Sequence, residues 1–315
     1  MSLLRKASAD LSFEGAVLFD EPMANHTSYQ VGGPAELYLI PQSEGDIIGA
    51  ISLAALSESS IFVLGAGANI LVSDSGIPGI VLDMGCFDAC RITGEGIVCG
   101  AGLNITDASQ AAADNGFTGM EFIYSMPGSV GGSVCMNARC YGRSVSDILE
   151  CVEIIDSSGD TKLEYPSLDM FGYKRSPYQR QFCVITQVSF RLRPGDPARI
   201  SASMRDYRDD REKKGHFAAP SAGSVFKNNR DFGRPSGKII DSLGLRGERI
   251  GGAMISKVHA NIIVNTGGST AMDILRLITL IEGRVYQGFG HVLEREVILV
   301  GEWDQGSLKA AAPSK

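Results

Sequence analysis

The sequence lacks the features of a membrane-inserted, metal-binding or nucleic-acid-binding protein. Its 315 residues contain no apolar run near the ~18 residues of a membrane span, and Arg5, Lys6, Asp10 and Glu14 interrupt the N-terminus where a signal peptide would be apolar. The net charge of −7 argues against a nucleic-acid-binding surface. No spacing of His, Cys and carboxylate residues suggests a metal site. We therefore expect a cytoplasmic protein with no membrane insertion and no nucleic-acid partner.

Paired cysteine motifs are also missing. The seven cysteines are an odd number and form no Cys-x-x-Cys pair, so a disulfide framework or a structural zinc site is not expected. These residues are Cys86, Cys90, Cys99, Cys135, Cys140, Cys151 and Cys183. An odd number of cysteines without paired motifs is typical of a protein in the reducing cytoplasm.

Neither standard nucleotide-binding loop occurs, although glycine is abundant. Residues 65–70 read Gly-Ala-Gly-Ala-Asn-Ile after the apolar run at residues 61–64. Ile70 stands where the dinucleotide fingerprint Gly-x-Gly-x-x-Gly requires its third glycine, and no Gly-x-x-x-x-Gly-Lys-Ser/Thr loop is present. The stretch is therefore interpreted as a loop that follows a strand without being a Rossmann turn.

A second glycine stretch, Met-Pro-Gly-Ser-Val-Gly-Gly, occupies residues 126–132. Gly128, Gly131 and Gly132 permit positive φ and close approach to the backbone, and Pro127 fixes one φ. Backbone N–H groups freed in such a turn could converge on an anion such as a dinucleotide diphosphate. A tight structural turn is the alternative interpretation. Two such loops about sixty residues apart suggest one extended ligand that lies across both.

Together with Asn137-Ala-x-x-Tyr-Gly142, these stretches resemble the FAD-binding loops of the UDP-N-acetylenolpyruvoylglucosamine reductase family. The resemblance runs from about residue 25 to residue 301, with several motifs in the family's order. It implies non-covalent FAD, NADPH as the hydride source and an enolpyruvyl UDP-sugar as substrate. The implied cofactor-binding residues are Gly65, Ala66, Gly67, Ala68, Asn69, Ile70, Pro127, Gly128, Ser129, Gly131, Gly132, Asn137, Tyr141 and Gly142.

The order of predicted elements favours an α+β fold over a regular βαβ repeat. The resemblance implies an FAD-binding domain of the vanillyl-alcohol-oxidase/CO-dehydrogenase-flavoprotein (PCMH) type in residues 1–195, with lobes at about 20–85 and 86–195. It also implies an α+β substrate domain in residues 196–303, followed by a tail at 304–315. Two prolines and a glycine in residues 194–197 predict the junction. We expect the tail to be disordered.

Four local expectations are specific enough to test. The ordered region is expected to open at Asn25, and a capping box to begin a helix at Ser43 with Asp46. A charged helix is predicted over residues 204–214, ending at Gly215. A single closing strand is predicted over residues 293–301.

Reduction of an enolpyruvyl ether requires a hydride at its terminal carbon and a proton at the carbon that bears the carboxylate. Ser224, in Gly-Ser-Val-Phe-Lys-Asn, matches the family motif whose serine is the proton donor, and Lys227 is the nearby charge. By itself, a serine after glycine is usually a turn residue. Glu296 best matches the family's active-site glutamate in Leu-x-x-Glu-Val, with Glu294 in reserve. A strand would point both glutamates the same way.

The family pattern Tyr-Arg-x-Ser appears here as Tyr173-Lys174-Arg175-Ser176. The family arginine helps to hold the substrate carboxylate, and lysine offers a point charge where arginine offers a planar fork. Either Lys174 takes this role or a backbone shift brings in Arg175. The residues assigned to substrate binding are Tyr173, Lys227, Asn228, His259 and Glu294.

The resemblance favours an NADPH-dependent reductase that forms UDP-N-acetylmuramate for peptidoglycan. The compact segment from Ser176 to Phe182 favours the family's shorter form, which has no inserted substrate-closing loop. Two alternatives remain open. One is an FAD-dependent oxidase of the same fold superfamily, and the other is a flavin- or nucleotide-binding protein without catalysis, which the lysine at position 174 makes plausible.

Overall fold

A computed structural model describes residues 2–303, and the predicted tail at 304–315 lies outside them. The described chain forms two compact units. Unit 1 contains the described residues up to Asp20, then Glu36–Ala66 and Gly79–Asp210. Unit 2 contains Glu21–Ala35, Gly67–Pro78 and the described residues from Arg211 onward. The division after Asp210 lies inside a helix, and the functional division at residue 195 stays a prediction.

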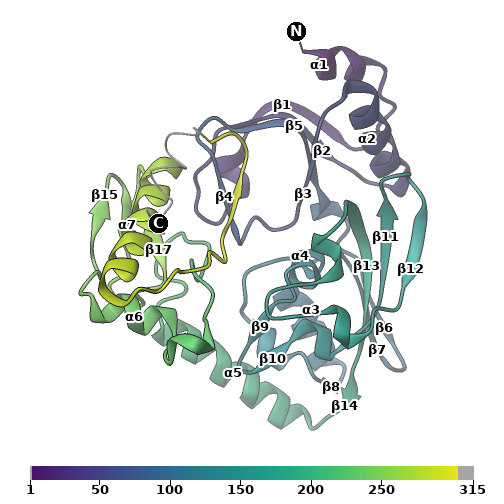
Figure 1. Cartoon of the computed structure of the whole chain (residues 1–315). Helices are drawn as coiled ribbons and strands as arrows, with labels where there is room; N and C mark the ends of the chain where they lie inside the picture. The colour runs from purple at the N-terminus through teal and green to yellow at the C-terminus, as the bar shows by residue number, and fades with distance from the viewer. Residues whose placement is uncertain (1, 304–315) are drawn as a thin grey trace. The chain divides into compact units, whose positions relative to one another are not determined.

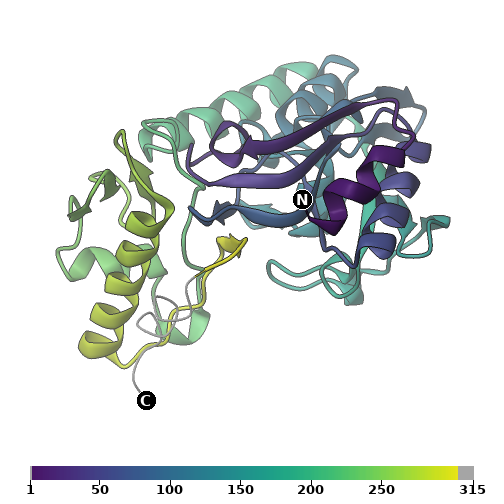
Figure 2. The same ribbon diagram turned by 90° about the horizontal axis from the view of Figure 1, so that it is seen from above.

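The first sheet of unit 1 has four strands in the order β1 (Ala16–Pro22), β2 (Pro34–Ile40), β5 (Ile77–Asp83) and β3 (Ile61–Leu64), with β3 parallel to β5. Helix α2 (Glu44–Ser57) shares a buried core with β2 and β5. The N-terminal helix α1 (Leu3–Ala7) lies beside α2 (Figures 1 and 2). Because α1 and β1 precede Asn25, the expected opening of the ordered region there was wrong.

The start of α2 corrects the capping-box expectation. Ser43 Oγ accepts the N–H of Asp46, as expected for an N-cap. The buried Asp46 carboxylate does not return to Ser43, because it accepts the N–H groups of Glu14, Gly15 and Gln42. A carboxylate with three backbone donors ties the N-terminal segment to the helix. That use depends on residues about thirty positions away, which a local pattern does not reveal.

The second sheet of unit 1 is antiparallel throughout. Its strands, in spatial order, are β12 (Thr161–Glu164), β11 (Leu149–Asp156), β13 (Cys183–Arg191), β7 (Gly96–Gly100) and β6 (Cys90–Thr93). Helices α3 (Ile105–Asp114) and α4 (Val130–Cys135) share its core (Figure 1). Two short ladders complete the unit, β9 (Arg139–Cys140) with β10 (Arg143–Ser144) and β8 (Phe117–Thr118) with β14 (Arg193–Pro194).

Helix α5 (Pro197–Lys213) begins seven residues before the predicted helix over 204–214. Proline is tolerated in the first turn because its missing N–H would have no helical partner there. Pro197 is the first residue of this helix as well as a boundary signal, so the predicted start at residue 204 was too late.

Unit 2 contains a three-stranded antiparallel sheet of β15 (Arg249–Ile250), β16 (Ala253–Ile255) and β17 (Ile263–Asn265). Helices α6 (Ser236–Ser242) and α7 (Ala271–Phe289) pack in the same buried core. Thr270 and Asp273 form a reciprocal capping box at the start of α7. Strands β4 (Ile70–Val72) and β18 (Ile298–Val300) pair in parallel.

The predicted closing strand was too long. Regular pairing covers only Ile298–Val300, and residues 293–297 contribute one isolated bridge between Arg295 and Phe226. Both Glu296 and Val297 direct their N–H groups at the Val225 carbonyl, which interrupts the ladder. None of the helices within residues 2–303 is long and apolar enough to cross a membrane.

Candidate active site

The glycines of the first loop are required by protein contacts. A Cβ added at Gly65 would lie 2.3 Å from Ser129 Oγ in unit 1. Gly67 has φ +60°, and its Cβ would lie 1.9 Å from the His26 carbonyl oxygen in unit 2. Among residues 2–303, no protein acceptor takes the backbone N–H groups of Ala66 and Ala68. The loop thus has a fixed path and offers donors to a ligand.

Asn69 links the end of this loop to the segment that carries Glu296. Its Nδ2 donates to the Glu296 carbonyl at 3.1 Å, and its own carbonyl accepts the N–H of Ile298 at 3.0 Å. Ile70 then begins β4, which pairs with β18. A predicted cofactor-loop residue therefore also fixes the backbone of a predicted catalytic residue within unit 2.

The second loop differs from expectation in its donors. Ser129 caps α4, and its Oγ accepts the Gly132 N–H at 3.2 Å. The N–H groups of Val130 and Gly131 donate to the carbonyls of Leu103 and Ala101, each at 2.8 Å. These three donors hold the loop in place, so they are not free to converge on an anion as the sequence analysis expected.

Open space remains at two other glycines of unit 1. Gly128 has φ +143°, and its added Cβ would meet only Ser133 Oγ, at 3.7 Å. Gly142 has φ +82° and nothing within 4 Å. Pro127, beside Gly128, is exposed. A flat ring system or a diphosphate can approach bare backbone at such positions, so these residues fit a bound dinucleotide.

Asn137 is buried and bonds the turn at residues 172–175. Its Nδ2 donates to the Gly172 carbonyl at 2.9 Å, and its Oδ1 accepts the Ser146 N–H at 3.1 Å. Tyr141 stacks on Tyr207, with ring centroids 4.2 Å apart, and donates its hydroxyl proton to Asp210 at 2.7 Å. The contacts of Asn137 therefore give it a structural task beside its predicted cofactor role.

Residues 172–175 form a closed turn in unit 1. Gly172 and Arg175 exchange backbone hydrogen bonds of 3.0 and 3.1 Å, and Lys174 between them has φ +56°. Ser176 is buried and donates to the Cys135 carbonyl at 2.6 Å. A lysine in the left-handed region is strained unless its surroundings impose the conformation, and such residues cluster at functional sites. No inserted loop follows, because only residues 177–182, which include the short turn Pro177–Gln179, separate Ser176 from β13.

In unit 2, Asn261 fixes the segment that carries Ser224. Its Oδ1 accepts the Phe226 N–H at 3.0 Å, and its Nδ2 donates to the Phe226 carbonyl at 2.8 Å. Its own carbonyl accepts the Val225 N–H at 2.9 Å, and Ser224 bridges to Ile262. The proposed proton donor is therefore held in an extended backbone with defined register.

Glu296 lies on the other side of this same segment. Its N–H donates to the Val225 carbonyl at 2.7 Å, which places it beside the residue that follows Ser224. Between the two glutamates, Arg295 makes a double contact with Glu282 of α7, at 2.6 and 2.7 Å. Glu282 is buried on the apolar face of α7, four residues after Ile278. A buried carboxylate requires a partner. The position of Glu282 on an apolar helix face was therefore a sequence signal for the ion pair with Arg295, and it was not recognised.

The second glutamate, Glu294, is paired with Lys227. Glu294 accepts a salt bridge from Lys227 Nζ at 2.6 Å, and its carbonyl accepts the Lys227 N–H at 2.9 Å. The charge of Lys227 is thus offset locally, which weakens its predicted action on Ser224. Asn228 Oδ1 accepts the N–H of Ser236, the first residue of α6, at 3.0 Å. Lys227, Asn228 and Glu294 all have structural contacts.

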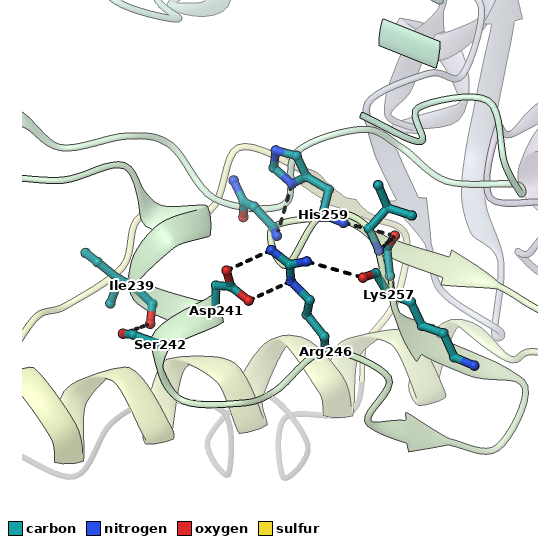
Figure 3. A network of polar contacts seen from close by, with 9 residues as sticks. Ile239, Asp241, Ser242, Arg246, Lys257 and His259 are labelled. Carbon is teal, nitrogen blue, oxygen red and sulfur yellow. Dashed lines mark hydrogen bonds and ion pairs between the residues drawn. The ribbon is translucent and has the colours of Figure 1, made fainter. Parts of the chain in front are cut away.

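His259 lies in a basic part of unit 2 (Figure 3). Its Nδ1 accepts the Asn261 N–H at 3.2 Å, and Arg246 nearby contacts Asp241 and the Lys257 carbonyl. Burial lowers the pKa of His259 below its usual 6.5, and positive charges, beginning with Lys214 and then Arg246, lower the pKa further. The ring is therefore neutral near pH 7.

No group of three or more His, Cys, Asp or Glu side chains within residues 2–303 could hold a metal ion. A family model described as an FAD binding domain matches residues 35–163. With the α+β architecture, this match places the chain among FAD-binding proteins, in agreement with the predicted fold class.

The remaining comparisons identify the family. The model of the UDP-N-acetylenolpyruvoylglucosamine reductase C-terminal domain matches residues 215–300. The reductase of that name from Treponema denticola is 38% identical over 309 residues, covering 92% of this chain and 95% of the relative. The one from Geobacter metallireducens is 39% identical over 292 residues, covering 91% and 95%. The chain belongs to the UDP-N-acetylenolpyruvoylglucosamine reductase family.

A solved structure agrees with this assignment. The crystal structure of UDP-N-acetylenolpyruvylglucosamine reductase from Thermus caldophilus superposes with a TM-score of 0.77 at 31% identity. It covers 92% of this chain and 100% of that chain. The resemblance on which the predicted fold was based is thereby confirmed.

Proposed function

We propose that this protein reduces UDP-N-acetyl-3-O-(1-carboxyvinyl)-glucosamine to UDP-N-acetylmuramate, with NADPH as the reductant and FAD as the bound cofactor. The observation that carries the proposal is the backbone contact between Glu296 and Val225. It brings the predicted proton donor, Ser224, and the predicted active-site glutamate onto adjoining segments of unit 2, although they are about seventy residues apart in sequence.

FAD would be held non-covalently by the two glycine loops and the Asn137–Gly142 segment. Bound there, it supplies the hydride chemistry between NADPH and the enolpyruvyl carbon. The loops contain no histidine, and the nearby His26 ring is paired with Glu21 at 2.9 Å. Acid precipitation should therefore leave the yellow colour in the supernatant, and colour retained in the pellet would contradict non-covalent binding.

We assign proton donation to Ser224 Oγ, at the carbon that bears the substrate carboxylate. Glu296 is assigned to the same reaction centre because its backbone is held beside Val225 while its side chain is only partly exposed. Glu294, whose carboxylate binds Lys227, stays in reserve. The match of Glu296 to the family stretch Leu-x-x-Glu-Val supports Glu296 over Glu294 for the catalytic role.

Lys174 or Arg175 would bind the substrate carboxylate, and Tyr173 would lie beside it. The strained turn supports Lys174, because it retains Tyr173 and Ser176 on either side of the lysine. The positive surroundings of His259 suit the anionic part of a sugar nucleotide. We assign an indirect part in substrate binding to Lys227, Asn228 and Glu294, because each of these residues makes structural contacts within unit 2.

We further propose that the reaction takes place in the cytoplasm, since the described cysteines are free thiols and the reductant is a nicotinamide nucleotide. The partners are then NADPH and the enolpyruvyl UDP-sugar. The domain roles follow the same assignment, with FAD bound by residues 1–195 and substrate by residues 196–303.

The test uses purified protein under anaerobic conditions. NADPH should bleach the flavin absorbance, and the enolpyruvyl sugar nucleotide should restore it. If only oxygen restores the colour, the protein is an oxidase. If NADPH never bleaches the flavin, the protein binds flavin without this catalysis.

A further inference from the structure

Cys90 and Cys99 face each other across the hairpin formed by β6 and β7 in unit 1. They are direct partners in the strand register, and their Sγ atoms lie 3.9 Å apart. Neither residue takes part in the proposed reaction. Two thiols at this distance need only a side-chain adjustment to bond, because a disulfide has an S–S length of about 2.05 Å.

The hydrogen-bond pattern of the hairpin favours a cross-link at this position. The N–H of Gly100 donates to the Ala89 carbonyl at 2.7 Å, so the next pair, Cys90 with Cys99, occupies a non-hydrogen-bonded position. Such pairs have a Cα separation of about 4.5 Å, the closer of the two antiparallel spacings. That separation lies within the range of about 4.4–6.8 Å found for disulfides.

The two thiols differ in access to solvent. Cys90 is exposed on β6, the edge strand of the sheet, whereas Cys99 is fully buried on β7. Burial, with the nearby Cys90 as a smaller cause, raises the pKa of Cys99 far above its usual value. An oxidant from solvent therefore reaches Cys90 first, and Cys99 is placed to react with the oxidised sulfur.

We propose that Cys90 and Cys99 form a reversible disulfide when the protein meets a peroxide. The Cys90 sulfur attacks one peroxide oxygen, the O–O bond breaks, and a sulfenic acid forms with release of water. The Cys99 sulfur then attacks the Cys90 sulfur. An S–S bond forms, the S–O bond breaks, and the leaving hydroxide takes the Cys99 proton as a second water. Two thiols are oxidised while one hydrogen peroxide is reduced to two waters.

The cross-link would lie close in sequence to the residues that hold the second glycine loop by hydrogen bonds. Cys99 precedes Ala101 by two residues, and the carbonyls of Ala101 and Leu103 hold the N–H groups of Gly131 and Val130. The disulfide would therefore fix the hairpin that directly precedes the carbonyls to which this loop is hydrogen-bonded. It would form on the cofactor-binding unit without using any residue proposed to contact substrate.

The experiment treats the reduced full-length protein with hydrogen peroxide, blocks the remaining thiols, and maps cross-linked peptides by mass spectrometry. The expected result is a Cys90–Cys99 linked peptide and an intact mass lower by two hydrogen atoms, both reversed by dithiothreitol. Recovery of Cys90 as a sulfinic acid without a link, or of links only between other cysteines, would overturn the proposal.

Variants separate this pair from the other thiols. Cys90→Ser should abolish the link and should fold normally, because the side chain is exposed. Cys86→Ser, at another exposed cysteine, is the matched control and should retain the link. Cys99→Ala should leave Cys90 open to over-oxidation, with folding checked by circular dichroism. A Cys99 cross-link that persists in Cys90→Ser and is lost in Cys86→Ser would assign the bond to Cys86 and overturn the proposal.

Discussion

Asn137 and Asn261 are both buried, and each holds one of the two segments proposed to act on substrate, but they hold them differently. Asn261 bonds both the N–H and the carbonyl of a single residue, Phe226, as a neighbouring strand would. Asn137 instead joins two separate backbone groups, at Gly172 and Ser146. The first fixes an extended segment in register, and the second ties a turn to a loop.

The difference shows where strain is stored. Lys174 in the turn of unit 1 has φ +56°, and Asn137, which bonds this turn, has φ +41°, so both non-glycine residues lie in the left-handed region. The Ser224 segment makes an isolated bridge to Ile262, and its left-handed residue is Gly223 at φ +69°, a conformation that glycine adopts without a steric penalty. We therefore expect the Lys174 turn to relax when its contacts are removed, while the Ser224 segment loses register.

The largest expected effect is at Ser224. Ser224→Ala should leave flavin reduction by NADPH unchanged and slow reoxidation by substrate by about 10²–10⁴-fold, because only the second half-reaction needs the proton. Stopped-flow absorbance under anaerobic conditions measures both steps. Ser221→Ala is the control and should be unaffected. Equal loss in both half-reactions would make Ser224 a structural residue.

Substitution of each asparagine by alanine tests the comparison between them. Asn261→Ala leaves the N–H and carbonyl of Phe226 unbonded in the core and should lower the free energy of unfolding by about 2–4 kcal/mol. Asn137→Ala should cost less, about 1–2 kcal/mol, because the strained turn can relax. Denaturant unfolding of both variants checks the order. A larger loss for Asn137→Ala would contradict the account of stored strain.

The lysine at position 174 gives the third prediction. If it binds the substrate carboxylate, Lys174→Ala should slow substrate reduction by roughly 10–100-fold, the worth of one hydrogen bond to a charged group. Arg175→Ala should then be mild, and Lys174→Arg should retain or improve activity through its fork geometry. Both alanine variants should keep FAD.

Rate measurements on the two alanine variants decide between the residues. The reverse ranking would assign the carboxylate to Arg175. No effect from either change would remove this turn from the reaction and support binding without catalysis.

The smallest expected effect is on pH dependence. Because burial lowers the pKa of folded His259 below 6.5, the unfolded chain takes up this proton more readily. The free energy of unfolding should therefore fall as the pH drops below about 6.5, and this contribution should be constant above it. Guanidinium unfolding at several pH values compares the protein with His259→Gln, which should show a shallower slope. Identical slopes would contradict the inferred environment of the ring.

Local signals in the sequence predicted much of the fold. The cap predicted at Ser43 marked the start of α2, because a cap depends on residues within one turn. The failures involved distant partners. Asp46 bonds Glu14 and Gly15, and β1 is an edge strand whose exposed residues show no apolar alternation.

The candidate site shows the same limit. The motifs around Ser224 and Glu296 were recognisable, but their contact through Val225 needed the folded chain. The glycines of the second loop indicated a turn, yet the distant carbonyls of Ala101 and Leu103 determine which N–H groups remain available. Glu282 on an apolar helix face was a local signal that the helix packs against a basic partner, Arg295. That signal was overlooked.

The most direct measurement is a single turnover in deuterium oxide, with flavin reduced by NADPH before the enolpyruvyl sugar nucleotide is added without oxygen. We expect UDP-N-acetylmuramate with a solvent-derived deuteron on the carbon that bears the carboxylate, delivered through the exchangeable hydroxyl of Ser224. Nuclear magnetic resonance of the product locates that deuteron. Recovery of unreacted substrate, with flavin reoxidised only when oxygen is admitted, would contradict the proposed reductase activity.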